Sequence, residues 1–227
     1  MRKFIIKYRD IILLTIGTML VVLSLCLLFY DRFELLKSNV FAEVEKEKYL
    51  ERNSDVPEDE SDEVENVETD NVDENTVNTS GDWKTKIAKE FIGYLEIKKI
   101  NLSQGLVSKK SYYNKLHYNI QILNESDYPD KENGNVMLAS HSGSSYVSFF
   151  KNLYKLDKGD EAKIRYKGYV YTYKIVNIYN VPKVGKVKIS RNFSKSCLTL
   201  ITCTHNSKTE QTVYILELTS KVKDGDK

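Results

Sequence analysis

Residues 198–203 are Leu-Thr-Leu-Ile-Thr-Cys, a short run of apolar and β-branched residues that ends in a cysteine. Such alternation of Leu, Thr and Ile is typical of a buried strand. The residues from Thr204 to Lys208 are polar, so Cys203 stands where a strand gives way to a loop. A strand end can hold a reactive side chain rigid and still accessible. Taken alone, the stretch fits a small buried core thiol as well as it fits a nucleophile.

The sequence around this stretch predicts a mostly β domain. Apolar or alternating runs, separated by glycines and polar turns, recur at short intervals and predict seven or eight short strands. The clearest lie at 91–97, 134–141, 161–166, 169–179, 197–203 and 212–218. Helical spacing is confined to 83–90, 149–156 and a turn at 112–116. We therefore expect a closed barrel with one or two short helices over residues 83–220, followed by a polar tail at 221–227.

The formal net charge of +2 conceals a segregation of charge along the chain. From Asp55 to Asp82 there are twelve Asp and Glu and no Lys or Arg, whereas 83–227 holds 25 Lys and Arg against 13 Asp and Glu. Since the acidic stretch has few aromatic residues and its charges repel one another, we expect 31–82 to be a largely disordered tether. It lacks the spacing of an EF-hand loop, which disfavours calcium binding.

The N-terminus indicates where the basic domain is located. Residues 11–30 form an uncharged run of twenty residues, which is about the length of a single transmembrane helix. The excess of Lys and Arg before it predicts a cytoplasmic segment at 1–10 and an extracellular position for everything after residue 30. A cleaved signal peptide is the alternative, but no small-residue cleavage site follows the run. An extracellular basic domain is not expected to bind nucleic acid, and it suits an anionic membrane or wall surface instead.

Cysteine usage suggests a thiol that is kept reduced. Cys26 lies within the predicted membrane helix, which leaves Cys197 and Cys203 in the exterior domain. Six residues along one extended strand separate two Cα atoms by about 20 Å, which is beyond the reach of a disulfide. At least one of the two is therefore expected to act as a free thiol.

A second strand end carries a histidine. His141 follows the apolar run 134–139 and precedes the polar loop Ser142-Gly-Ser-Ser145. A cysteine and a histidine are the minimum for thiol-based acyl transfer, because the thiolate attacks and the imidazolium protonates the leaving group. The alternative for His141 is a hydrogen-bonded structural residue.

These two strand ends resemble those of the sortases, cysteine transpeptidases of the Gram-positive cell surface. Thr-Leu-Ile-Thr-Cys at 199–203 matches their TLxTC nucleophile motif, and Ala-Ser-His-Ser-Gly at 139–143 is similar to their histidine segment. Residues 91–97 resemble the first barrel strand of the family, and 150–160 resemble the helix and turn after the histidine. The likeness covers roughly residues 91–219. It implies an eight-stranded sortase β-barrel with Cys203 as nucleophile, His141 as proton donor and Thr202 at the bound substrate.

The resemblance also implies an activity and its partners. A sortase cleaves a sorting motif near the C-terminus of a secreted protein through a thioacyl intermediate on the cysteine. It then transfers the acyl group to an amine of a cell-wall precursor or a pilin. A single-pass membrane anchor with an extracellular catalytic domain fits this activity, and neither a cofactor nor a metal is expected.

One position departs from the family pattern. Sortases usually carry an arginine at the start of the strand after the cysteine, where this chain has Gln211, and no arginine follows Cys203. A neutral amide can also donate to a developing oxyanion, so Gln211 is the predicted substitute, with Lys208 and Arg191 as alternatives. The departure leaves a second function open: a catalytically weak or inactive sortase-like domain that binds ligands at the cell surface.

The remaining candidates point to other chemistries only weakly. His205 is expected to share a strand face with Cys203, but zinc usually needs three or four protein ligands and few further Cys or His are available. His117 lies in a tyrosine-rich polar stretch and is interpreted as structural. Ser140 and Ser142 flank His141 without an evident second base, so a serine hydrolase is not predicted.

Overall fold

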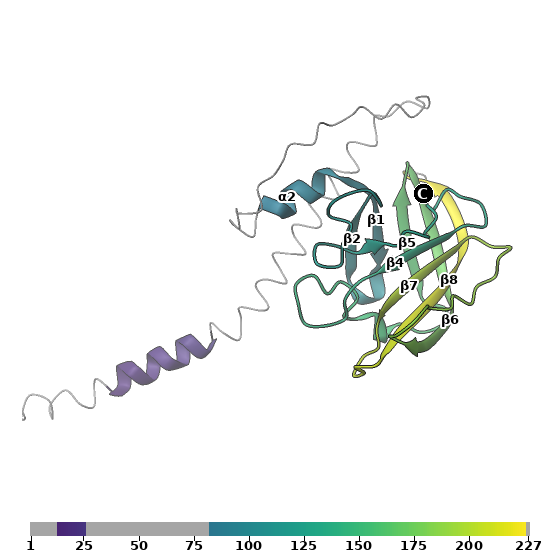
Figure 1. Cartoon of the computed structure of the whole chain (residues 1–227). Helices are drawn as coiled ribbons and strands as arrows, with labels where there is room; N and C mark the ends of the chain where they lie inside the picture. The colour runs from purple at the N-terminus through teal and green to yellow at the C-terminus, as the bar shows by residue number, and fades with distance from the viewer. Residues whose placement is uncertain (1–12, 26–81, 226–227) are drawn as a thin grey trace, which may run out of the picture. The chain divides into compact units, whose positions relative to one another are not determined.

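The computed structural model describes residues 13–25 and 82–225 (Figure 1). The chain divides into two compact units, Met1–Val44 and Glu45–Lys227. In the first unit, residues 13–25 form an α-helix that is exposed along its whole length. Among the described residues, no helix combines the length and the apolar character that crossing a membrane requires. The predicted span at 11–30 extends beyond the described helix at both ends, and nearly all of the predicted tether at 31–82 lies outside the described residues.

The second unit is mostly β, as predicted. Its helical elements are short: the α-helix α2 (Asp82–Lys89) and the 3-10 helices η1 (Lys98–Ile100) and η2 (Leu153–Lys155). The eight strands are β1 (Phe91–Ile97), β2 (Leu102–Val107), β3 (Gln121–Ile122), β4 (Asn135–Ala139), β5 (Glu161–Tyr166), β6 (Tyr169–Pro182), β7 (Cys197–Cys203) and β8 (Glu210–Lys223).

The strands form one sheet in the order β2-β1-β5-β6-β8-β7-β4-β3, which curls into a nearly closed barrel. The edge strands β2 and β3 do not pair with each other. The side chain of Asn119 spans this seam instead: its Nδ2 donates to the carbonyl of Gly105 at 2.8 Å, and its Oδ1 accepts from Gln104 at 2.9 Å. The expectation of a closed barrel is therefore corrected at this seam.

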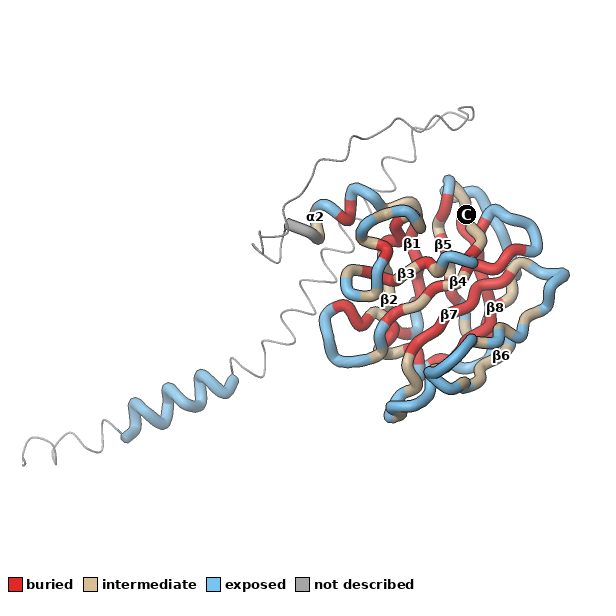
Figure 2. Tube along the Cα trace, in the orientation of Figure 1, coloured by how far each residue is buried: buried red, intermediate tan, exposed pale blue. Residues whose placement is uncertain are grey.

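Strand β7 lies between β8 and β4 in the sheet, and its two faces are both buried. Leu198 and Leu200 belong to the main core of the barrel, whereas Ile201 belongs to a second apolar cluster with Val213 and Ile215 of β8. Because both faces are buried, the side chains of β7 are either apolar or, like Thr199 and Thr202, carry a hydroxyl that is hydrogen-bonded inside the protein. Figure 2 shows this strand buried almost to its end, and only Cys203 is partly accessible.

Several predicted boundaries differ from the structure, and two of the differences are large. Residues 149–156 form turns and the short helix η2 rather than an α-helix. Phe150, Leu153 and Leu156 are buried at a spacing of three residues, which suits 3-10 geometry because residues i and i+3 then align. Strand β8 continues to Lys223, where it pairs with Tyr169 of the equally long β6. The first residues of the predicted tail therefore belong to the sheet.

Candidate active site

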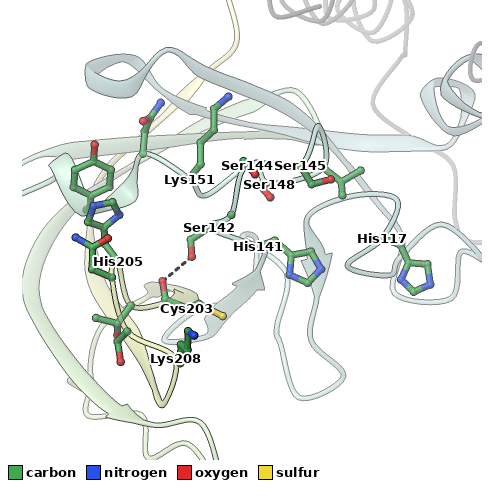
Figure 3. Close-up of a pocket in the computed structure, with 17 residues that line it drawn as sticks. His117, His141, Ser142, Ser144, Ser145, Ser148, Lys151, Cys203, His205 and Lys208 are labelled. Atoms are coloured by element: carbon green, nitrogen blue, oxygen red, sulfur yellow. Dashed lines mark hydrogen bonds between the residues drawn. The ribbon is translucent and has the colours of Figure 1, made fainter. Parts of the chain in front are cut away.

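Parallel pairing of β4 with β7 brings the predicted histidine and cysteine to the same edge of the sheet. The register pairs Ala139 with Ile201, and His141 and Cys203 each follow two residues later. Because both strands run in one direction, their carboxyl ends meet at this edge. Figure 3 shows the sulfur of Cys203 directed toward the imidazole of His141. His141 is exposed and Cys203 is half-buried, so a substrate can reach both side chains.

Hydrogen bonds between the two strand ends hold this arrangement. The Thr202 hydroxyl donates to the carbonyl of Ser140 at 2.8 Å, and the Ser140 amide donates to the carbonyl of Ile201 at 3.3 Å. The Ser142 hydroxyl donates to the carbonyl of Cys203 at 2.8 Å. The backbone on both sides of the two reactive side chains is thus tied across the strands. Thr202 is buried and its hydroxyl is already bonded inside the protein, so its contact with substrate stays a prediction.

A cavity of about 1020 Å³ opens in front of the two side chains. Its walls are the serine-rich segment 141–148, the turn around η2 and the loop 204–208 between β7 and β8. Two lysines, Lys151 and Lys208, line it together with three histidines and several hydroxyl groups, and none of the 17 lining residues is Asp or Glu. A pocket of this composition favours ligands that carry negative charge or accept hydrogen bonds.

A ring stack joins two of these walls. The imidazole of His205 in the β7–β8 loop stacks on the ring of Tyr154 in η2, with 4.0 Å between ring centroids and an angle of 13° between the planes. The described part of the chain holds no group of three or more His, Cys, Asp or Glu that could bind a metal. His117 also lines the pocket, and its ring lies 5.4 Å from that of Tyr118.

The register places Gln211 directly opposite Cys203 on the antiparallel strand β8. Residues that face each other in this way present their side chains on the same face of the sheet. The Gln211 amide donates to the carbonyl of Pro182 at 3.3 Å, and Gln211 is not among the residues that line the cavity. Lys208, in contrast, lines the cavity from the β7–β8 loop.

Arg191 is excluded as a substitute for the missing arginine. Its guanidinium donates to the carbonyls of Asn133 at 3.0 Å and Lys195 at 3.3 Å, next to Cys197 at the start of β7. The active-site edge is at the other end of this strand, about 20 Å away for a seven-residue strand. The β6–β7 loop folds back to the beginning of β7, which the residue pattern did not reveal.

Sequence reasoning missed several residues of the pocket, among them Lys151 and Tyr154. Both follow His141 within the segment that forms one wall, and their proximity in sequence to the histidine was the signal available. The predicted helix at 149–156 obscured it, because the turns that replace the helix determine which side chains reach the cavity.

Comparison with known proteins agrees with this geometry. The sequence model of the Sortase domain matches residues 95–218, which is more than half of the chain. Sortase A of Listeria monocytogenes is 20% identical, with a TM-score of 0.50 over 59% of this chain and 90% of that chain. Sortase C1 of Streptococcus agalactiae is 26% identical, with a TM-score of 0.50 over 59% of this chain and 69% of that chain.

A second structure of the S. agalactiae sortase C1, in complex with MTSET, is 23% identical, with a TM-score of 0.53 over 60% of this chain and 72% of that chain. None of the curated proteins matches this sequence. The domain match covers β4, which His141 follows by two residues, β7, which ends at Cys203, and most of β8. The chain belongs to the sortase family of cysteine transpeptidases.

Proposed function

We propose that this protein is a membrane-anchored transpeptidase that cleaves a C-terminal sorting motif of secreted proteins and transfers the acyl group to an amine of the cell wall or of a pilin. The observation that carries the proposal is the meeting of Cys203 and His141 at one end of the paired strands β4 and β7, open to a pocket. Membership of the sortase family supports the same chemistry.

In the first half-reaction, the sulfur of Cys203 attacks the backbone carbonyl of the sorting motif. A C–S bond forms and the C–N bond breaks. The electron pair of the broken bond leaves with the nitrogen, which takes a proton from the His141 imidazolium. The products are a thioester on Cys203 and a free amine. A thiol suits this exchange because it is both a good nucleophile and a good leaving group.

In the second half-reaction, an acceptor amine attacks the thioester carbonyl. A C–N bond forms, the C–S bond breaks, and its electron pair returns to the sulfur of Cys203. The imidazole of His141 accepts the proton that the amine releases, which restores the starting state. The net reaction is an exchange of one amide for another and involves no change in oxidation state.

The oxyanion that forms during acylation needs a donor, and we assign this role to Gln211. Its amide faces the same side as Cys203, and its present bond to Pro182 is long and exposed, so the amide can turn toward the substrate. Loss of one oxyanion donor costs about 3–4 kcal/mol in other enzymes. Gln211→Ala should therefore slow single-turnover thioacylation about a hundredfold or more without unfolding the barrel. Unchanged acylation in this variant would remove Gln211 from the mechanism and leave Lys208 as the donor.

Anchoring in the membrane is supported by the first unit of the chain. The helix at 13–25 exposes large apolar side chains, among them Leu14 and Met19 at 69% and 76%. The uncharged run of which it is part extends from residue 11 to residue 30. Protease treatment of intact cells should digest the barrel and leave a membrane-embedded N-terminal fragment. Recovery of the whole chain in the soluble fraction would contradict the anchor.

The absence of the usual arginine favours the alternative of a non-catalytic binding domain. Labelling with a thiol-reactive substrate analogue distinguishes this alternative from the catalytic proposal. We expect one adduct, located at Cys203 by mass spectrometry, that forms about a hundredfold or more slowly in His141→Ala because the acid–base group is lost. The matched control Cys197→Ala should form the adduct normally. No adduct, or an equal rate in His141→Ala, would favour the binding domain.

A further inference from the structure

The charge of the active-site pocket has a consequence for the molecules that enter it. No carboxylate lines the pocket, whereas Lys151 and Lys208 reach it from two different walls. Among the residues the structure describes, neither lysine has an ion-pair partner. Lys99 on another part of the barrel illustrates the usual arrangement, since it pairs with Asp157 at 3.3 Å and Asp160 at 2.7 Å. Positive charge without a protein counter-ion attracts anionic ligands into such a cleft.

Lys151 lies on the wall of the pocket that follows His141 in the chain. It directly follows Phe150, whose amide donates to the carbonyl of His141 at 3.1 Å, so its backbone is anchored to the histidine. In the proposed reaction, His141 protonates the departing amine, and the acceptor amine takes the reverse route to the thioester. The acceptor therefore approaches along the wall that carries His141 and Lys151. Figure 3 shows Lys151 on this wall, above Ser142 and beside the further serines, with its amino group turned away from Cys203. The long side chain therefore has to rotate to meet a bound acceptor.

The same wall contains a buried hydroxyl that makes no hydrogen bond within the described structure. Ser148 is 3% exposed and its Oγ has no partner. A Cβ atom on Gly143 would lie 3.7 Å from this oxygen, so the hydroxyl lies directly beneath the serine-rich loop. Buried polar groups are nearly always hydrogen-bonded, and an unsatisfied donor here adds to the preference of this wall for a ligand rich in acceptor oxygens.

We propose that the acceptor of this transpeptidase carries an anionic group, a carboxylate or a phosphate, within a few bonds of its reactive amine, and that Lys151 binds this group. The proposal rests on the transpeptidase function proposed above and specifies the chemical class of its second substrate. Neutral amines enter the same pocket without this ion pair, and they resolve the thioester more slowly.

Matched amines test the proposal on the full-length protein. Cys203 is loaded with a short peptide thioester, and its release by β-alanine is compared with release by β-alaninamide. Phosphoethanolamine and ethanolamine form a second pair that distinguishes phosphate from carboxylate. Each rate is measured per thioacyl-enzyme by mass spectrometry, so effects on the loading step cancel. The intrinsic difference in amine reactivity cancels when the anionic-to-neutral rate ratio of a variant is divided by that of the wild type.

Lys151→Gln should lower this ratio about fivefold, the effect of one partly exposed ion pair, in at least one of the two pairs. Lys151→Arg keeps the charge and should keep most of the preference, which separates charge from folding effects. Lys158→Gln is the matched control, since it removes an equal charge from the same segment at an exposed position that does not line the pocket. We expect it to behave as the wild type.

The outcomes separate the two proposals. If Lys151→Gln has the wild-type ratio for both pairs, the anionic acceptor is refuted while the transpeptidase stands. The same holds if Lys158→Gln lowers the ratio equally, because the effect is then a general property of the surface charge. If Cys203 accepts no thioester, or if no amine releases it faster than water does, the transpeptidase function itself is contradicted, and this inference with it.

Discussion

Strand β7 carries one cysteine at each end, and the two thiols have opposite surroundings. Cys197 is 1% exposed, and its sulfhydryl donates to the carbonyl of Lys195 at 3.4 Å. Burial raises the pKa of this thiol, which keeps it in the unreactive protonated form. Cys203, on the same face of the same strand, is partly accessible and opens into the pocket beside His141. Reactivity therefore depends on the loop that adjoins each end rather than on the strand.

The two adjoining loops differ in what they cover. The loop before Cys197 folds over the thiol. Arg191 fixes this loop by donating hydrogen bonds to the carbonyls of Asn133 and Lys195. The loop after Cys203 leaves that thiol partly accessible, and the stack of His205 on Tyr154 joins this loop to η2. One loop seals its end of the strand, and the other forms the wall of a cavity.

The largest expected difference is in the rate of modification by a small thiol reagent. Cys203 should react directly, whereas Cys197 reacts only in molecules that open locally or globally. Since opening of a core costs about 5 kcal/mol or more, the two rates should differ about a thousandfold or more. Peptide mapping over time, in the wild type and in Cys197→Ala, measures both rates. Similar rates at both cysteines would show that the seal over Cys197 is open in solution.

A pair of buried threonines tests whether the two ends differ in function as well as in access. Thr199 donates to Asn135 Oδ1 at 2.9 Å near the Cys197 end, and Thr202 donates to the Ser140 carbonyl at 2.8 Å near the Cys203 end. Substitution of either by valine should lower the free energy of unfolding by about 1–3 kcal/mol, because a buried partner is left without its bond.

Only Thr202→Val should also slow thioacylation, because the Ser140 carbonyl that it releases directly precedes His141. Chemical denaturation and adduct formation, measured on the two purified variants, give the comparison. Equal loss of acylation in Thr199→Val would mean that the active-site edge depends on the whole strand and not on its final residues.

The smallest expected effect is the dependence of stability on alkaline pH. The pKa of Cys197 is raised above its ordinary value of 9.0 in the folded protein, chiefly by burial. The thiol therefore contributes stability that is fully present below pH 9.0, and this contribution is lost as the pH rises through the folded-state pKa.

Cys197→Ala should consequently lose less stability than the wild type as the pH rises from about 8 to 10. Denaturation midpoints at several pH values measure the two slopes. Burial also raises the pKa of Tyr171 and of Tyr214 to about 12. The wild type and Cys197→Ala should therefore lose stability together at still higher pH. Parallel slopes below pH 10 would show that the thiol at the sealed end is already ionised or already exposed.

The sequence predicted the strands better than it predicted their contacts. The bounds of β7 and β5 were predicted correctly because their apolar alternation ends at polar turns. The neighbourhood of β4 and β7 was not predictable from periodicity, since β5 and β6 intervene along the chain and the pairing is parallel. The resemblance to sortases, in contrast, predicts that His141 and Cys203 share one site.

The walls of the pocket were the least predictable part of the site. Lys151, Tyr154 and His205 come from short turns and the one-turn helix η2, and they meet only because separate segments converge on one edge of the barrel. The placement of Arg191 was open for the same reason, because a long loop can return to either end of the strand it precedes. In both cases, tertiary contacts determine positions that local residue patterns leave undetermined.

The parallel register of β4 and β7 has one more consequence, for how this protein could be altered. The spacing between imidazole and thiol is set by two adjacent strands, whereas the pocket walls are segments that begin beyond the strand ends. The exposed parts of these segments can therefore be exchanged while the reacting pair keeps its position, provided that Ser142 and the buried Phe150 are kept. Grafting other sequences onto the exposed residues 143–146 or onto the 204–209 loop is accordingly a route to a new acceptor preference on an unchanged reaction.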